Sequence, residues 1–155
     1  QFRLSQRVVP MMIKSGGGSI VNVSGRTAYQ SALPPGSTCT GPAKAAELRF
    51  TSDLAAELRP HAIRVNCIVP GVVITDERFE KWERESAGNA YDETEALARR
   101  EKIVAEYGPW GDAEAVADAI VYLASPRANY VNGESILVDG ANKNSYTRII
   151  RDYQD

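Results

Sequence analysis

Histidine and cysteine are scarce in this 155-residue chain, and their scarcity narrows the chemistry that it can perform. His61 is the only histidine, and the two cysteines, Cys39 and Cys67, are far apart and form no CxxC pair. Zinc sites need several His, Cys or carboxylate ligands, usually with short spacings between them. The sequence therefore argues against a metal site, and unpaired cysteines favour reduced thiols in a cytoplasmic protein over a disulfide.

An excess of one charge and long apolar runs are lacking as well. Basic residues number 18 and acidic ones 20, for a formal net charge of −2, and no block of basic residues occurs. Nucleic acids and acidic membrane surfaces are bound through such blocks, so neither is an expected partner. No apolar run approaches the roughly 20 residues that span a bilayer, and the amino-terminal stretch does not have the pattern of a signal peptide.

What the sequence does contain is an ordinary globular composition, with 43% hydrophobic and 25% charged residues. This composition favours a soluble domain that acts on small molecules. Because the chain begins with Gln1 rather than methionine, we expect it to be a piece of a longer protein.

The apolar pattern predicts alternating helices and strands. The predicted helices are 1–14, 42–58, several within 76–106 and one after Asp112; the predicted strands are 19–23, 63–69 and 135–138. Such alternation builds right-handed crossovers over a parallel sheet, and the near-continuous apolar run at 63–69 is typical of a strand covered on both faces. Three strands alone would leave a long apolar edge, so the predicted α/β fold is part of a larger doubly wound domain.

Several short segments, taken in order, resemble the short-chain dehydrogenase/reductase (SDR) family. They match its fifth strand, its Tyr-x-x-x-Lys segment, its sixth strand with the cofactor loop, and its seventh strand region. These segments are Gly18-Ser-Ile-Val-Asn-Val-Ser24, Thr40-Gly-Pro-Ala-Lys44, Ile63-Arg-Val-Asn66 with Pro70-Gly-Val-Val-Ile-Thr75, and Tyr130-Val-Asn-Gly133 with Leu137-Val-Asp-Gly140. Each is short, but their order and spacing are specific.

The resemblance implies a Rossmann-like fold, of which this chain holds the C-terminal half, after the fourth strand. It covers residues 1–141, with 76–106 as an insertion resembling a substrate lid and 142–155 as a tail. The family's glycine-rich phosphate loop would lie upstream of Gln1. Gly16-Gly-Gly18 does not replace that loop, because it leads into a strand, whereas phosphate binding needs glycines that open a helix.

The family's catalytic residues are only partly matched. In the family, tyrosine is the general acid or base, lysine lowers its pKa and holds the cofactor ribose, and serine orients the substrate. Lys44 matches the lysine, whereas Thr40 stands at the tyrosine position and Gly25 at the serine position. Ser24 lies one residue earlier and is expected to point elsewhere by strand alternation. A threonine hydroxyl is shorter and far less acidic than a phenol, whose pKa is about 10, so Thr40 cannot act as a like-for-like replacement.

The cofactor loop is matched at Pro70, Gly71, Val73 and Thr75. The resemblance implies that Thr75 contacts the cofactor phosphate or carboxamide and that Val73 offers its backbone to the carboxamide. Alternatively, Thr75 caps the next helix, and Lys44 is an exposed lysine on a first helical turn. NAD or NADP is implied for the complete protein, whereas this chain alone is expected to bind neither, because it lacks the phosphate loop.

Three functions remain open, and so does the question of whether the protein is catalytically active. The first is an NAD(P)-linked oxidoreductase of a small alcohol or ketone, in which Tyr29 could supply a relocated phenol and Thr38 and Cys39 could line the site. A packed loop cysteine is the ordinary alternative for Cys39. The second is a catalytically silent subunit that pairs with an active relative, and the third is a lyase, isomerase or dehalogenase on the same fold.

An oligomer is the expected assembly. The helix at 42–58 carries two apolar stripes, which is more apolar surface than one sheet contact requires. This helix and the last strand resemble the family's oligomer contacts. We therefore expect a homo-oligomer, or a hetero-oligomer with an active SDR relative.

Overall fold

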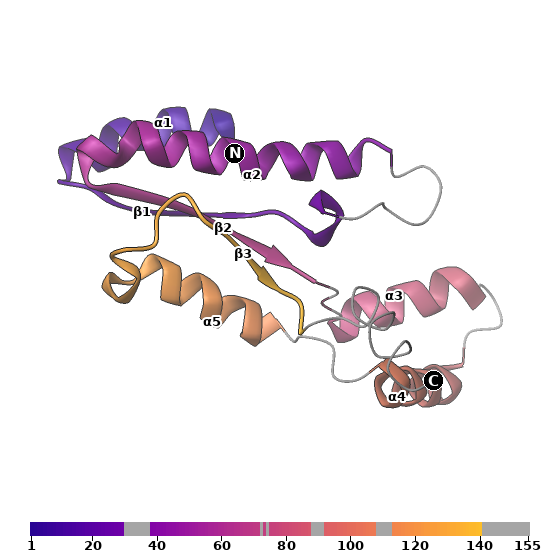
Figure 1. Ribbon diagram of the computed structural model, residues 1–155. Helices are drawn as coiled ribbons and strands as arrows, with labels where there is room; N and C mark the ends of the chain where they lie inside the picture. Colours follow the sequence, from indigo (N-terminus) through magenta and orange to yellow (C-terminus); the bar gives the residue numbers. More distant parts are fainter. Residues whose placement is uncertain (30–37, 72, 74, 88–91, 108–112, 141–155) are drawn as a thin grey trace, which may run out of the picture.

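The computed structural model describes residues 1–29, 38–71, 73, 75–87, 92–107 and 113–140. Three strands form one parallel sheet in the order β1-β2-β3, with β2 in the middle (Figure 1). β1 spans Gly18–Val23, β2 spans Ile63–Pro70 and β3 spans Ser135–Val138. The predicted α/β fold with a parallel sheet is confirmed.

Helices cover both faces of this sheet. α1 (Phe2–Lys14) and α2 (Thr40–Leu58) lie on one face, and α5 (Ala113–Ala124) lies on the other (Figure 1). α3 (Asp76–Ala87) and α4 (Glu93–Tyr107) lie beyond the carboxyl ends of the strands. None of the helices in the described ranges combines the length and the apolarity needed to cross a membrane.

Short 3-10 helices follow three of these elements. η1 (Arg26–Ala28) follows β1, η2 (Arg59–His61) follows α2, and η4 (Pro126–Ala128) follows α5. α2 begins at Thr40, earlier than the predicted start at Pro42. Pro42 is nevertheless tolerated, because backbone N–H groups in the first helical turn have no intrahelical acceptor.

The core lies on both sides of β2. Ile63 and Val65 pack with Ala55 and Leu58 of α2, whereas Ile68 packs with other apolar side chains on the opposite side. That second cluster also contains Leu123 and Ala128. Burial on both faces explains why β2 reads as a continuous apolar run rather than as an alternating one.

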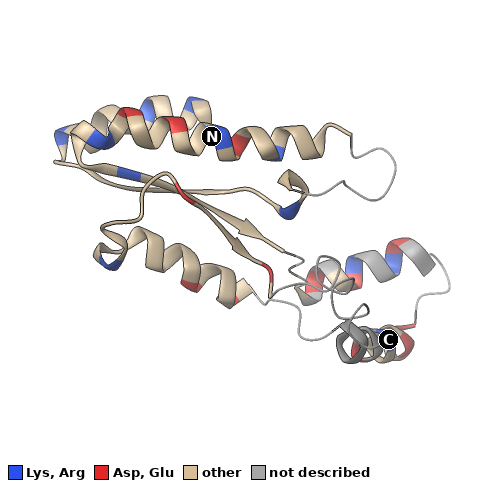
Figure 2. Ribbon diagram, in the orientation of Figure 1, with Lys and Arg blue, Asp and Glu red and all other residues tan. Residues whose placement is uncertain are grey.

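Charged side chains are concentrated on the helices, and Arg64 is the one charged residue within the three strands (Figure 2). This distribution fits a sheet whose two faces are both covered, because burying an unpaired charge is costly. Arg64 lies near the amino end of β2, where its guanidinium is hydrogen-bonded to backbone carbonyls of the following elements.

The glycine run between α1 and β1 is a helix-to-strand turn, as predicted. Gly16, Gly17 and Gly18 have φ angles of 90°, 120° and 150°, a region that other residues rarely adopt. A Cβ on Gly17 would also collide with the carbonyl oxygen of Ala62. The turn therefore needs glycine for its backbone conformation and for its contact with the start of β2.

Candidate functional site

The carboxyl ends of the three strands meet at one edge of the sheet, where open α/β sheets bind their ligands. The parallel register pairs Val23 with Ile68 and Pro70 with Val138, so the segments after these residues emerge side by side. η1 follows β1 at this edge and packs against α2. At the contact between them, a Cβ on Gly41 would approach the carbonyl oxygen of Thr27 to 3.2 Å.

Gly25 and Lys44 lie next to each other at this edge. A Cβ on Gly25 would lie 3.9 Å from both Cδ and Cε of Lys44, an ordinary van der Waals contact. The preceding residue, Ser24, is buried, and its hydroxyl donates a hydrogen bond of 2.9 Å to the carbonyl oxygen of Lys44. The hydrogen bond of the Ser24 hydroxyl thus holds the end of β1 against α2, and the Lys44 side chain passes beside Gly25.

Lys44 is paired with an acidic residue that we did not predict. Its Nζ lies 3.1 Å from Oε2 and 3.4 Å from Oε1 of Glu47, one turn later on α2. The two side chains are 33% and 24% exposed. A glutamate three residues after a lysine on a predicted helix is a signal that the sequence does contain. Any group that binds the Lys44 ammonium must share it with Glu47 or replace Glu47.

A series of buried hydrogen bonds fixes the position of α2 on the sheet. Asn22 Nδ2 of β1 donates to Thr51 Oγ1 at 2.9 Å, and Thr51 Oγ1 donates to the Glu47 carbonyl oxygen at 2.8 Å. Thr51 is completely buried and Asn22 is nearly so. Because this chain of hydrogen bonds ties β1 to the turn of α2 that carries Lys44 and Glu47, it holds that turn over the carboxyl part of the sheet.

Cys67 lies in β2 close to the same network. Burial raises the pKa of its thiol, and hydrogen bonds from Ser24 and Thr51 only partly offset this effect. A raised pKa lowers the thiolate fraction at neutral pH, and the thiolate is the reactive form. Cys67 is thus a core residue, whereas Cys39 precedes α2 and is exposed.

The structure places the remaining predicted residues as follows. Thr40 is the first residue of α2, exposed and one turn before Lys44. Tyr29 follows η1 and is 55% exposed. Thr38 and Cys39 are exposed just before α2. The segment 30–37, which joins Tyr29 to Thr38, lies outside the described residues.

The cofactor-loop candidates begin where β2 ends. Pro70 is the last residue of β2, and Gly71 N–H donates to the Val138 carbonyl oxygen at 2.9 Å. A Cβ on Gly71 would lie 2.5 Å from Cβ of Asp139, so only glycine allows the chain to pass here. Val73 is half-buried, and the carbonyl oxygen of Thr75 accepts from Phe79 N–H in the first turn of α3.

Arg26 is a second residue that we did not predict. It follows Gly25 directly, and its Nη1 is buried without a hydrogen-bond partner in the described part of the protein. A buried guanidinium nitrogen without an acceptor is costly, so we expect its acceptor to come from a part of the protein outside the described residues or from a ligand. The sequence shows only an arginine next to Gly25, which does not by itself indicate burial.

Comparison with known proteins identifies the family. The family model described as enoyl-(acyl carrier protein) reductase matches residues 1–141. Dehydrogenase/reductase SDR family member 4 of Homo sapiens is 34% identical over 137 residues, which are 88% of this chain and 45% of that protein. The 3-oxoacyl-[acyl-carrier-protein] reductase FabG of Thermotoga maritima is 37% identical over 141 residues, 90% of this chain and 51% of that protein.

A solved structure agrees with these relatives. L-sorbose reductase from Gluconobacter frateurii, complexed with NADPH and L-sorbose, superposes with a TM-score of 0.75 and 31% identity, over 90% of this chain and 52% of that one. The fold is that of a Rossmann-like α/β domain. The chain belongs to the short-chain dehydrogenase/reductase family, and it spans about half the length of the curated relatives it matches.

Proposed function

We propose that the complete protein is an NAD(P)-linked oxidoreductase that acts on a small alcohol or ketone. The observation that supports it most is the position of Lys44 at the carboxyl edge of the sheet, beside Gly25 at the end of β1. The similarity to a reductase whose structure contains NADPH and L-sorbose supports the same class of cofactor and substrate. Two free cysteines, one of them buried in the core, favour a cytoplasmic location.

The residues at this edge fit the nicotinamide half of such a cofactor. The Lys44 side chain is one-third exposed, and its ammonium suits ribose hydroxyl groups, which accept hydrogen bonds. Gly71, with its tight contact to Asp139, starts a loop whose backbone at Val73 would hold the carboxamide, and Thr75 would contact the carboxamide or a phosphate. When bound, the cofactor would supply the hydride. The pyrophosphate needs a glycine-rich loop before a helix, which the sequence of this chain does not contain.

The reaction also needs a proton donor. Thr40 and Gly25 stand where the family carries its tyrosine and serine, and an aliphatic hydroxyl is a poor acid. Tyr29, exposed after η1, is the phenol that we propose as a relocated donor. We further propose that residues 76–106, which include α3 and α4 beyond the carboxyl edge, cover the substrate, within a domain of residues 1–141 followed by a tail at 142–155.

The cofactor is tested by titrating the complete protein with NADH and NADPH in a calorimeter. We expect binding of at least one of them, and about tenfold weaker binding by Lys44→Met, because a charge-assisted hydrogen bond is lost. Lys14→Met, at the exposed end of α1, removes the same charge elsewhere and should bind as the unchanged protein does. Absence of binding to the complete protein would overturn the proposal.

A silent subunit that pairs with an active relative is the second candidate. Gly25 and Thr40 favour it, because they stand at the positions where we predict the family's serine and tyrosine. Exposed apolar side chains favour it as well. Phe2 and Leu4 on α1 are 60% and 68% exposed, and Leu137 on the edge strand β3 is 47% exposed. We propose that these faces of α1 and β3, together with α2, form oligomer contacts. Ultracentrifugation of the complete protein should show a dimer or tetramer, and co-purification of an active relative would separate the second candidate from the first.

A further inference from the structure

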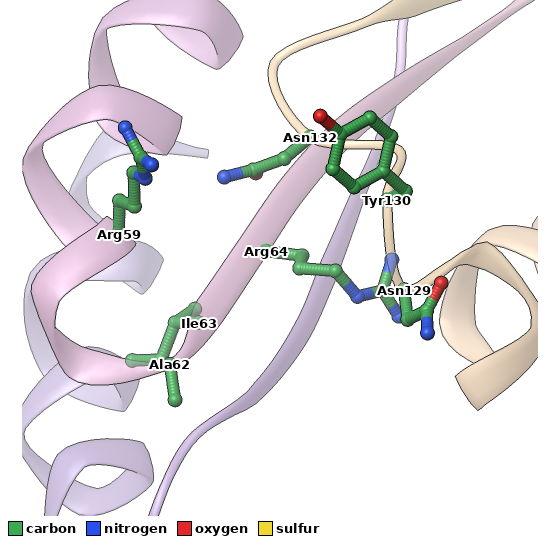
Figure 3. A pocket seen from close by; sticks show the side chains of 7 residues that line it. All are labelled: Arg59, Ala62, Ile63, Arg64, Asn129, Tyr130 and Asn132. Atoms are coloured by element: carbon green, nitrogen blue, oxygen red, sulfur yellow. The ribbon is translucent and has the colours of Figure 1, made fainter.

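A cavity of about 560 Å³ opens at the edge of the sheet opposite the candidate site, where β2 and β3 begin. Its walls come from η2 at the end of α2, from the first residues of β2, and from the segment between η4 and β3 (Figure 3). The polar side chains that line it are Arg59, Arg64, Asn129, Tyr130 and Asn132. No aspartate or glutamate is among its lining residues, so its walls carry two positive charges and no negative one.

Asn132 presents its amide NH2 group, a donor, toward this cavity. Its Oδ1 accepts a hydrogen bond of 2.8 Å from Val65 N–H, which fixes the amide and leaves its Nδ2 to face outward. The amide nitrogen of Asn132 points toward the side of the cavity on which Arg59 lies (Figure 3). Arg59 is exposed and has no ion-pair partner within the described ranges. Two donor groups therefore face a common space without an acceptor of their own.

Arg64 fixes the opposite wall. Its Nη1 donates to the Leu123 carbonyl oxygen at 2.8 Å, and its Nη2 donates to the Ser125 carbonyl oxygen at 3.0 Å, both at the end of α5. The negative end of the α5 dipole offsets part of the Arg64 charge, but these neutral carbonyls do not cancel it. Arg64 is thus a positioned cation in the wall, whereas Arg59 remains available for a ligand.

Tyr130 lies at the opening of the cavity. Its side chain is fully exposed, and its ring stands at the rim of the cavity near Asn132 (Figure 3). Against the described residues this ring has no packing role, whereas at a binding site it offers an apolar face together with a hydroxyl donor. A cavity of this volume exceeds the size of a single ionic group, so the ring is in place for the rest of a small molecule.

We propose that this cavity binds a small molecule through its phosphate group, with Arg59 as the main contact and Asn132 and Tyr130 as further donors. The forked guanidinium matches two phosphate oxygens at once. Two positive charges match a phosphate dianion better than a carboxylate monoanion. Because the cavity lies at the amino ends of the strands, this site is separate from the one at Gly25 and Lys44, and the proposal does not depend on the proposed function.

The experiment is calorimetric titration of the complete protein with phenyl phosphate at low ionic strength. We expect binding, and about tenfold weaker binding by Arg59→Gln, because a charge-assisted hydrogen bond is lost. The matched control is Arg127→Gln, which removes the same charge from an exposed side chain outside the cavity lining and should leave the affinity within about twofold. Lys44→Met should also leave it unchanged, which separates this cavity from the proposed cofactor site.

Two further probes make the outcome decisive. Tyr130→Phe keeps the ring and removes one donor, so we expect a loss smaller than that of Arg59→Gln, and acetate should bind more weakly than inorganic phosphate. Failure of the unchanged protein to bind phenyl phosphate would overturn the proposal. So would equal losses for Arg59→Gln and Arg127→Gln, which would mean a general charge effect, and so would acetate binding as tightly as phosphate.

Discussion

The Nζ of Lys44 lies 3.1 Å from Oε2 of Glu47, so the lysine that we predict to hold the cofactor is ion-paired within its own helix. The pair is joined to the sheet through the Glu47 carbonyl oxygen, which accepts from the buried Thr51. One turn of α2 therefore both presents a cation at the carboxyl edge and restrains it.

Glu47→Gln should tighten the binding of NADPH to the complete protein if Lys44 holds the cofactor. The amide cannot compete for the ammonium as a carboxylate does, but partly exposed ion pairs contribute only about 0.2–1 kcal/mol. The expected decrease in Kd is therefore no more than about fivefold. Asp53→Asn, which removes an exposed ion pair with Arg49 on the same helix, is the control and should not change Kd. Weaker binding by Glu47→Gln would show that Glu47 itself contributes to the site.

Thr51→Val should destabilise the complete protein by about 1–3 kcal/mol, because it leaves the buried amide of Asn22 without its acceptor. The free energy of unfolding is measured by urea denaturation. Ser52→Ala removes an exposed hydroxyl from the neighbouring position on α2 and should change it by less than about 0.5 kcal/mol. Equal effects of the two substitutions would mean that the hydrogen bond between Asn22 and Thr51 does not hold α2 to the sheet.

The two cysteines should react at very different rates with iodoacetamide near neutral pH. Cys39 is exposed, whereas burial raises the pKa of Cys67 and keeps it as the less reactive thiol. Mass spectrometry of the native protein should find Cys39 modified first, and both should react once the protein is unfolded. Modification of Cys67 at the rate of Cys39 would contradict the burial of β2.

The same raised pKa makes the stability depend on pH in a defined direction. The folded protein favours the neutral thiol. The contribution of Cys67 to the free energy of unfolding is therefore fully present below the ordinary thiol pKa of 9.0, and it decreases as the pH rises beyond that value. Cys67→Ala should remove this part of the loss of stability at alkaline pH, whereas Cys39→Ala should leave that loss unchanged.

The order and type of the elements could be predicted because each has a local signature. β2 is apolar throughout since both faces are covered, and the glycines before β1 mark a turn with positive φ angles. The ion pair of Lys44 with Glu47 could also have been predicted, because the two residues are three apart on a predicted helix. The cavity between Arg59 and Asn132 could not be predicted, because these residues are far apart in the sequence and line a common space only in the folded protein.

The buried hydrogen bond between Asn22 and Thr51 could not be predicted from the sequence either. Asn22 and Thr51 are 29 positions apart, and nothing in either local pattern specifies that they meet. Their contact follows from the way α2 packs across β1 and β2, which local propensity does not encode. Arg26 is similar, because the burial of its Nη1 results from packing and not from its neighbours in the sequence.

Substitutions at Gly25 and Thr40 test whether this is a reductase site that lacks two side chains. The contact of 3.9 Å between a Cβ on Gly25 and the Lys44 side chain leaves room for serine, and Thr40 lies one turn before Lys44. Thr40→Tyr combined with Gly25→Ser in the complete protein should therefore produce NADPH oxidation with at least one of a panel of small ketones. Neither substitution alone should do so, since serine without the phenol has no proton to transfer and the phenol without serine lacks an oriented substrate.

The length of the segment between Gly25 and Thr40 should limit the activity of the double variant. It is about two residues longer than we expect for the family, and a misplacement of about 1 Å can reduce a rate about a hundredfold. We therefore expect slow turnover, which Lys44→Met should abolish when added to the double variant. Activity of the unchanged protein equal to that of the double variant would reject the prediction and identify an acid in another place, in which case Tyr29→Phe is the substitution that should eliminate it.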